Sequence, residues 1–191
     1  MTRCTTIDPR PGARGLSEEA DLALPDGGQT NVAALQAMPI FGGIREDVLR
    51  FLLERCTRVS LPQDEYFFRE DDPADGLFVL ERGRVAVLKA WDGHQHLLGH
   101  LKAGDCFGEM ALMDLFPRSA SVLAIEPCDA LHLTNDGFYQ LYKKTLEQFA
   151  LIQMNLGREV SRRLRAADER WFRLGTRDPY PVRSDGQLPL L

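Results

Sequence analysis

The sequence predicts a mainly β protein, a β-barrel or jelly roll with helices on both sides. Between Thr57 and Leu133, short apolar runs are separated by turn residues, which is the spacing of strands in an all-β domain. Before and after this segment, apolar residues recur at helical spacing. The chain of 191 residues is 44% hydrophobic and 27% charged. It can therefore bury one core, and wholesale disorder, a fibrous repeat and a disulfide miniprotein are excluded.

Charge and cysteine usage narrow the function classes. The formal net charge of −5 argues against a protein that mainly coats nucleic acid or an anionic membrane. Cys4, Cys56, Cys106 and Cys128 include no Cys-x-x-Cys pair, so we expect reduced thiols rather than a zinc knuckle or a redox pair. The first residues lack the apolar core of a signal peptide, and no apolar stretch of about 18 residues occurs. We therefore expect a soluble, cytoplasmic protein.

The N-terminal part is expected to hold a leader and two short helices. Residues 1–31 contain Pro, Gly and short polar runs without sustained periodicity, which predicts a flexible leader. The segment VAALQAM, which begins at Val32, predicts a short helix that is followed by Pro39. Residues 45–56 predict a second helix. Its apolar face consists of Val48, Leu49, Leu52 and Leu53.

Two turn signals divide the predicted strands. Arg82-Gly83 joins two strand-like runs, and Asp92-Gly93 is a dipeptide typical of a two-residue hairpin turn. The strands are expected to enclose an aromatic core. Its members are Phe67, Phe68, Phe78 and Phe107.

The helical period returns after the predicted strands. Thr134 is predicted to cap a helix that contains NDGFYQLYKK, and a long helix is predicted from about Leu146 to Phe172. The domain thus spans residues 32–172, and residues 173–191 are expected to form an extended tail. Apolar residues on the long helix recur at steps of three and four, so this stripe either pairs two chains or packs on its own barrel. The stripe consists of Leu156, Val160, Leu164, Ala167, Trp171 and Leu174.

Residues 104–122, GDCFGEMALMDLFPRSASV, carry a candidate ligand site. Gly108 permits close approach of the backbone to a ligand, and the next residues can form a short helical turn whose free N–H groups attract an anion. Arg118 can return across this turn and offer a planar, permanently charged fork to a phosphate. Ser119 and the amide of Ala120 add further donors.

The neighbouring carboxylate has two explanations. Glu109 would repel a phosphate, but it would accept a hydrogen bond from a hydroxyl such as a ribose 2′-OH. Phosphate plus sugar is therefore one interpretation. A structural ion pair between Glu109 and Arg118 explains the same spacing equally well, so the residue types alone leave both interpretations open.

The segment FGEMALMDLFPRSASV resembles the phosphate-binding cassette of the cyclic nucleotide-binding domain family, which includes bacterial catabolite activator proteins and regulatory subunits of protein kinase A. Further segments resemble the family's first helices, early strands and long closing helix. They are ALQAMPIFGGIREDVLRFLLER, FFREDDPADGLFVLERGRVAV and LEQFALIQMNLGREVSRRLR. The resemblance runs over about 135 residues, from Val32 to Ala166. It implies a double-stranded β-helix (jelly-roll) barrel with short N-terminal helices and a long C-terminal helix.

The resemblance also implies ligand contacts. Glu109 would take the ribose 2′-OH and Arg118 the cyclic phosphate, while other positions would add donors, line the pocket or lie near the base. These positions are Gly108, Ser119, Ala120, Met110, Ala111, Leu98 and Gly99. Cyclic AMP is favoured over cyclic GMP because the cassette looks more like that of the bacterial activators. The closing helix has Ala167-Asp168 where some relatives place polar groups against the base, which leaves base selectivity open.

The function implied by the resemblance is a non-enzymatic cytoplasmic sensor of a cyclic mononucleotide. It would signal by repositioning its closing helix against a dimer mate or a partner protein. DNA-binding members continue into a helix-turn-helix, whereas this chain has a short Pro-containing tail, so no direct DNA binding is expected. The alternative is an interaction scaffold that binds no ligand or binds a cyclic dinucleotide.

A metal-dependent enzyme similar to a cupin is the alternative from another class. His94, His96 and His100 lie at even offsets on strand-like sequence, so all three could share one face and bind a metal. The cupin pattern also needs a Glu near His100 and a later His, for which His132 is the only candidate. Exposed strand histidines are the simpler explanation, and we expect neither a metal nor another cofactor besides the cyclic nucleotide.

Arginines are frequent near the end of the predicted long helix. A solvated helix face is the simplest interpretation, with a docking surface for an acidic partner as the alternative. The residues are Arg158, Arg162, Arg163, Arg165, Arg170 and Arg173.

Overall fold

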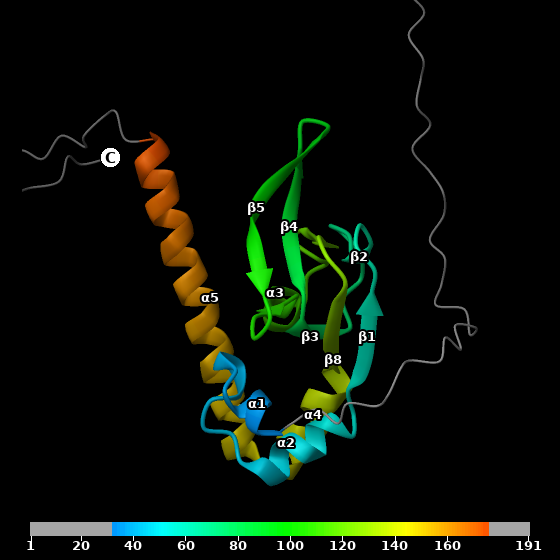
Figure 1. Ribbon diagram of the computed structural model, residues 1–191. Helices are drawn as coiled ribbons and strands as arrows, with labels where there is room; N and C mark the ends of the chain where they lie inside the picture. The colour runs from blue at the N-terminus through cyan, green and yellow to red at the C-terminus, as the bar shows by residue number, and fades with distance from the viewer. Residues whose placement is uncertain (1–31, 176–191) are drawn as a thin grey trace, which may run out of the picture.

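The computed structural model describes residues 32–175, so the predicted leader, Cys4 and residues 176–191 of the predicted tail lie outside the described residues. Two four-stranded antiparallel sheets form the predicted jelly roll (Figure 1). The first sheet has the strand order β1 (Thr57–Leu61), β8 (Cys128–Thr134), β3 (Gly76–Arg82) and β6 (Cys106–Phe107). The second has the order β2 (Tyr66–Phe68), β7 (Ser121–Ala124), β4 (Arg84–Trp91) and β5 (His94–Lys102). The predicted mainly β fold is confirmed.

Helices flank the roll, as predicted, and one short helix interrupts it. The helical elements are α1 (Val32–Gln36), the 3₁₀ helix η1 (Pro39–Phe41), α2 (Glu46–Leu53), α3 (Glu109–Asp114), α4 (Asn135–Lys144) and α5 (Leu146–Gly175). Within residues 32–175, no helix has the length and apolar character needed to cross a membrane.

Local sequence signals account for the turns. Asp92 and Gly93 both have positive φ angles, 49° and 75°, as a two-residue turn between β4 and β5 requires. Thr134 caps α4, because its hydroxyl accepts a hydrogen bond from the Gly137 amide at 3.1 Å. Gly83 joins β3 to β4 at a φ of 92°, and a Cβ there would lie 2.6 Å from the sulfur of Cys128. Only glycine fits that turn.

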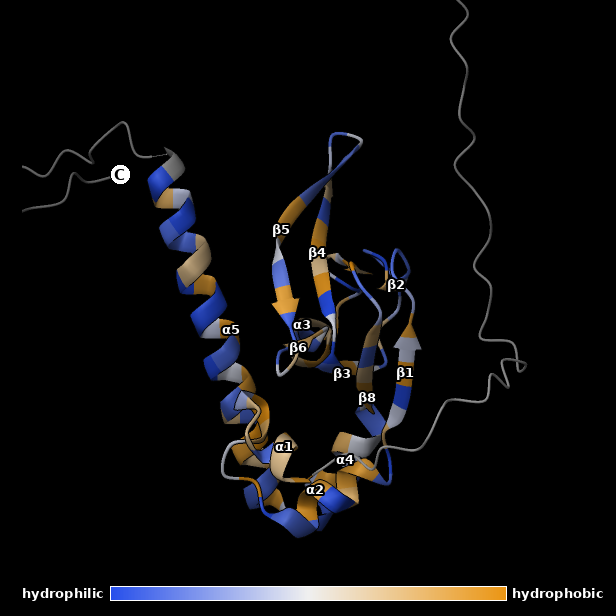
Figure 2. Ribbon diagram, in the orientation of Figure 1, coloured by the Kyte–Doolittle hydropathy of each residue, from blue (hydrophilic) through white to orange (hydrophobic). Residues whose placement is uncertain are grey.

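Two hydrophobic clusters form the core. The first joins the flanking helices to the face of β3 and β8 that points away from the interior of the roll, and it includes the predicted apolar face of α2, whose ribbon is coloured in Figure 2. The second lies inside the roll, where the rings of Phe78 and Phe107 stack with centroids 5.3 Å apart. Phe67 and Phe68 contact the same two rings. The predicted aromatic core is confirmed.

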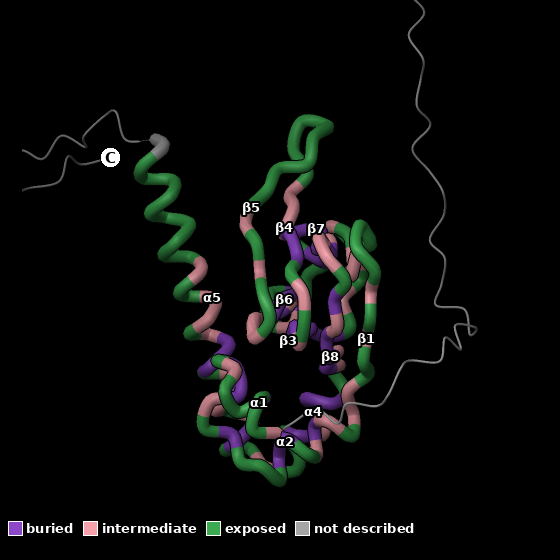
Figure 3. The backbone as a smooth tube through the Cα atoms, viewed as in Figure 1, coloured by how far each residue is buried: buried purple, intermediate pink, exposed green. Residues whose placement is uncertain are grey.

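Helix α5 buries one face in its first half and is largely exposed in its second half (Figure 3). In the first half, Leu156 is fully buried, and the amide of Asn155 donates to the carbonyl oxygens of Ile40 and Gly42. In the second half, Leu164 is 60% exposed. The predicted stripe is therefore divided, because its first member, Leu156, packs on its own chain, whereas Leu164, Ala167 and Trp171 are exposed.

Candidate ligand-binding site

A glycine in the left-handed region opens the cassette. Gly108 follows β6 with a φ of 78° and directly precedes α3. A Cβ at this position would lie 2.5 Å from Nη1 of Arg118 and 3.3 Å from Cε1 of Phe68. Leu115 ends α3, also with a left-handed φ of 60°, and the chain then returns to Arg118. The cassette therefore closes around the guanidinium of Arg118, and Gly108 leaves room for it.

Arg118 is held inside the protein. Its side chain is only 3% exposed, and Nη1 donates to the carbonyl oxygens of Gly76 at 2.7 Å and Gly108 at 3.0 Å. The guanidinium also lies 4.2 Å from the ring centroid of Phe68, a cation–π distance. Burial lowers the pKa of Arg118 from its ordinary value, and the nearby carboxylate of Asp75 opposes this effect. Asp75 Oδ1 lies 3.6 Å from Nη2.

Glu109 is tied to the long C-terminal helix. The residue is 5% exposed, and its Oε1 accepts a hydrogen bond from Nη1 of Arg163 at 3.0 Å. Nη2 of Arg163 also donates to the carbonyl oxygen of Cys106. Burial raises the pKa of Glu109, and the positive charge of Arg163 opposes the rise. Of the two interpretations left open by the sequence, an ion pair between Glu109 and Arg118 does not form, because each side chain pairs with a different residue.

The end of the cassette is fixed by a residue that the sequence analysis did not single out. Ser119 is exposed, and its Oγ lies 3.5 Å from the sulfur of Met110. Lys89 of β4 donates from Nζ to the carbonyl oxygen of Ser119 at 2.9 Å and to the carboxylate of Glu70. Met110 is half-exposed beside this hydroxyl. Lys89 thus anchors the segment in which the predicted phosphate donors lie.

The other predicted site residues lie in two places. Ala111 and Ala120 are buried within and after α3. Leu98 and Gly99 lie on β5, where the carbonyl oxygen of Leu98 accepts a hydrogen bond from Nη1 of Arg170 at 2.7 Å. The cassette residues and the β5 residues therefore both adjoin α5, through different arginines.

The interpretation of the α5 arginines as a solvated face is wrong for Arg163, which is partly buried, and incomplete for Arg170, which is exposed. Each of them bonds to the roll rather than to solvent alone. The physical reason is their position: Leu156, Arg163 and Arg170 recur every seven residues and so share the face on which Leu156 is buried. This spacing is the sequence signal that would have found them.

A shift in strand pairing separates the three histidines of β5. The pairing of β5 with β4 slips by one residue at Leu98. Because side chains alternate between faces along a strand, this bulge puts His100 on the opposite face from His94 and His96. The expectation that all three could share one face is wrong. Within residues 32–175, no group of three or more His, Cys, Asp or Glu is placed to hold a metal.

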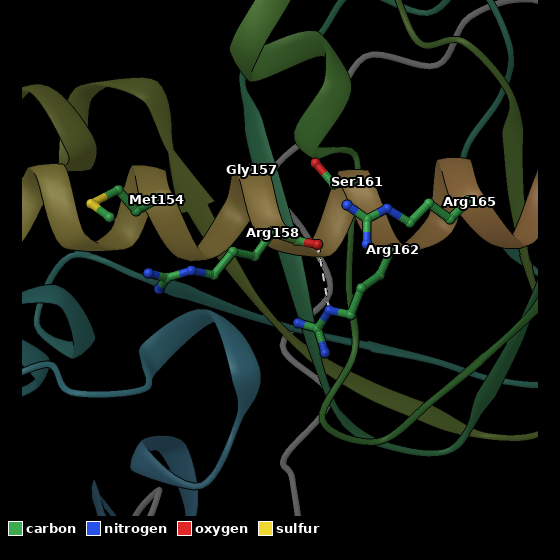
Figure 4. A pocket seen from close by; sticks show the side chains of 6 residues that line it. All are labelled: Met154, Gly157, Arg158, Ser161, Arg162 and Arg165. Atoms are coloured by element: carbon green, nitrogen blue, oxygen red, sulfur yellow. Dashed lines mark hydrogen bonds between the residues drawn. The ribbon is translucent and has the colours of Figure 1, made fainter.

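A shallow hollow lies on α5, away from the cassette. Figure 4 shows the side chains that line it on successive turns of the helix. They are Met154, Gly157, Arg158, Ser161, Arg162 and Arg165. None of them is among the predicted ligand-binding residues, so this hollow belongs to a different surface.

The fold and the site together define a β-roll with a cassette that is closed around a buried arginine and linked to a long closing helix. Residues 58–145 match the family described as "Cyclic nucleotide-binding domain". This part of the chain belongs to that family, whose domains are regulatory rather than catalytic.

Curated relatives agree with this assignment. The chain is 30% identical over 135 residues to the cyclic AMP receptor protein of Thermus thermophilus, covering 70% of this chain and 61% of the relative. It is 31% identical over 109 residues to the cAMP-dependent protein kinase regulatory subunit of Emericella nidulans, covering 57% and 26%. The chain thus spans less than two thirds of either relative.

Solved structures show the same architecture. A cyclic nucleotide-binding domain from Methylobacillus flagellatus superposes with a TM-score of 0.69 at 26% identity, covering 77% of this chain and 83% of that one. The catabolite activator protein of Thermus thermophilus superposes with a TM-score of 0.62 at 30% identity, covering 71% and 62%.

Proposed function

We propose that this protein is a non-enzymatic regulatory domain that binds a cyclic mononucleotide, with cyclic AMP favoured over cyclic GMP, and transmits binding through α5. The hydrogen bond between Glu109 and Arg163 carries this proposal, because it joins the cassette directly to the helix. The names of the relatives from Thermus and Emericella, which refer to cyclic AMP, support the choice of ligand. The cytoplasm is the proposed location.

Each end of the ligand has a partner in the proposed complex. The cyclic phosphate would bind Arg118, Ser119 and the amides that follow Gly108, where a fixed positive charge and free N–H groups favour an anion. The ribose 2′-OH would donate to the carboxylate of Glu109, whose Oε1 is already oriented by Arg163. The base would lie toward β5, near Leu98 and Gly99, with Met110 and Ala111 lining the pocket and Ala120 adding an amide.

Ligand binding would be coupled to α5 because the ribose and Arg163 would share the carboxylate of Glu109. A ligand shifts the position of a helix only by its different affinity for the two positions. With α5 docked, Arg163 favours the ionised form of Glu109, which is the better acceptor for a hydroxyl. By linkage, a docked α5 strengthens ribose binding, and ribose binding stabilises the docked α5 by the same factor.

A second copy of this chain is the proposed receiver of the signal. The predicted stripe keeps two strongly exposed members, Leu164 and Trp171, on the outer half of α5. Gly157 is four residues before Ser161, and Ser161 is three residues before Leu164, so both extend the same helix face. Their small side chains leave the hollow of Figure 4, into which a second helix can pack closely.

An interaction scaffold without a cyclic mononucleotide is the second candidate. The burial of Arg118 favours it, because both of its Nη1 hydrogen bonds already go to carbonyl oxygens of the chain. A thermal-shift panel separates the candidates, with cyclic AMP, cyclic GMP, cyclic di-GMP and divalent metals as ligands. A ligand at 100 times its dissociation constant stabilises a folded protein by about 2.7 kcal/mol. We expect this response for cyclic AMP, and no response to either cyclic mononucleotide would contradict the proposed function.

A further inference from the structure

Two buried nitrogen atoms lack a hydrogen-bond partner among residues 32–175. They are Nε of Arg118 and Nε2 of His132. Both side chains approach one exposed carboxylate: Oδ1 of Asp75 lies 3.6 Å from Nη2 of Arg118 and 3.2 Å from Nε2 of His132. The second distance is that of an ion pair once the histidine is protonated, although Nε2 makes no hydrogen bond in this arrangement. One carboxylate oxygen is therefore shared by the arginine and the histidine.

His132 also packs against the backbone that holds Arg118. The histidine pairs with Phe78 between β8 and β3, and the two rings stack with centroids 4.4 Å apart. A Cβ on Gly76 would lie 2.9 Å from Nε2 of His132, so the imidazole fills the space over this glycine. The carbonyl oxygen of Gly76 accepts the 2.7 Å hydrogen bond from Arg118. The imidazole thus lies beside both the carboxylate of Asp75 and the backbone of Gly76, the two groups that hold the guanidinium of Arg118 on this side.

Among the described residues, two charged side chains act on His132. Asp75, before β3, and Arg118, after α3, are the charged groups that act on it within residues 32–175. Its partner on β1 is Thr57 and its partner on β3 is Phe78, both uncharged. Burial lowers the pKa of His132, Arg118 lowers it further, and Asp75 raises it. A phosphate bound at Arg118 would add a negative charge on the same side.

We propose that His132, acting through Asp75, positions Arg118 for the ligand phosphate, so that protonation of His132 favours the phosphate-bound arrangement. This inference rests on the proposed function. A protonated imidazole pairs with Asp75 and weakens the hold of that carboxylate on Arg118, which is then free to bind the phosphate. Conversely, a phosphate partly neutralises Arg118 and so lowers the cost of a second positive charge nearby. Proton uptake by His132 and phosphate binding are therefore coupled.

Calorimetric titration with cyclic AMP from pH 8 to pH 5.5 tests the coupling. A one-unit difference in the His132 pKa between bound and free protein corresponds to about a tenfold change in affinity. We expect affinity to rise on acidification in the wild type and this rise to vanish in His132→Gln, which keeps a polar donor but cannot carry a charge. His94→Gln, at an exposed hairpin histidine, is the matched control and should keep the rise.

Protonation of Glu109 would act in the opposite direction, because a neutral carboxyl group is a weaker acceptor. Glu109 is present in the wild type, in His132→Gln and in His94→Gln, so its effect on affinity cancels when these proteins are compared with one another. In Asp75→Asn the pKa of His132 falls and the carboxylate that links His132 to Arg118 is lost, so we expect the rise in affinity to shrink and to move to lower pH. The same variant changes a 73% exposed side chain and should fold normally.

An NMR titration of the His132 ring in the wild type gives a readout that needs no variant. We expect cyclic AMP to raise the pKa of this ring. Equal pH dependence in the wild type and in His132→Gln, or an unchanged ring pKa in the complex, would overturn the inference while leaving the proposed function intact. Absence of binding at every pH would instead overturn the proposed function, and the inference with it.

Discussion

Arg163 donates a hydrogen bond from Nη1 to Oε1 of Glu109 at 3.0 Å, across 54 residues of sequence. The arginine lies on α5 and the glutamate at the start of α3. Arg163 is also paired with Glu159, one turn earlier on its own helix, at 3.4 Å. The contact between Arg163 and Glu109 ties the cassette to the closing helix.

Replacement of Arg163 by methionine should weaken cyclic AMP binding about tenfold, equivalent to about 1.4 kcal/mol. Methionine keeps much of the apolar stem but removes the charge that opposes the raised pKa of Glu109. That pKa should rise further, so the loss of affinity should be largest at low pH and shrink as rising pH ionises Glu109. Arg162→Met is the matched control, because Arg162 pairs only locally with Glu159. Calorimetry on both variants at several pH values checks this prediction, which equal losses in the two would contradict.

Replacement of Arg118 by leucine should lower the affinity for cyclic AMP at least a hundredfold, because a desolvated phosphate would lose its charged partner. The expected loss of binding free energy is on the order of 3 to 5 kcal/mol. The same change should destabilise the ligand-free protein by about 1 to 3 kcal/mol, since the carbonyl oxygens of Gly76 and Gly108 lose their donor. Arg118→Lys keeps the charge without the planar fork and should bind with intermediate affinity. Calorimetry and denaturant unfolding measure the two effects separately. Unchanged affinity in a folded Arg118→Leu protein would show that the cassette does not hold a phosphate.

Gly108→Ala and Gly104→Ala form a matched pair. Both glycines have positive φ angles, 78° and 94°, so alanine is strained by roughly 1 to 2 kcal/mol at either position. Only at Gly108 does the added Cβ meet another group, the guanidinium of Arg118, whereas nothing lies within 4 Å at Gly104. Both variants should therefore lose stability in thermal unfolding, but only Gly108→Ala should also lose most of its affinity for cyclic AMP. Similar affinities in the two variants would refute this account of the cassette.

Replacement of Leu164 by glutamate should convert the proposed dimer to a monomer. The side chain is 60% exposed on the outer half of α5, where a second chain would bury it, and two glutamates would then face each other in an apolar contact. Leu146→Glu is the control, because Leu146 is similarly exposed, at 62%, but lies at the start of the same helix, five turns and about 27 Å along the axis from Leu164. Light scattering at tens of micromolar protein measures the mass. A wild-type protein that is already monomeric under these conditions would rule out pairing through α5.

Local patterns determined much of this structure. The turn at Asp92-Gly93, the cap at Thr134 and the aromatic core around Phe78 all follow from residues that are close in sequence or share a strand period. The closeness of Gly108 and Arg118 could likewise be predicted, because both belong to one short segment that turns back on itself. Such features depend on backbone preferences and hydrophobic periodicity, which a sequence displays directly.

Only the tertiary structure decided which partners these residues take. Glu109 and Arg118 are nine residues apart in the sequence, yet they do not pair with each other. Glu109 pairs with Arg163 because α5 packs beside it, and Arg118 pairs with Asp75 of the segment before β3. A one-residue bulge at Leu98 turned His100 away from His96, and burial of Leu156 removed it from the exposed stripe. These outcomes depend on how distant elements dock. Docking is set by the sum of many weak contacts over the whole chain, so no local pattern specifies it.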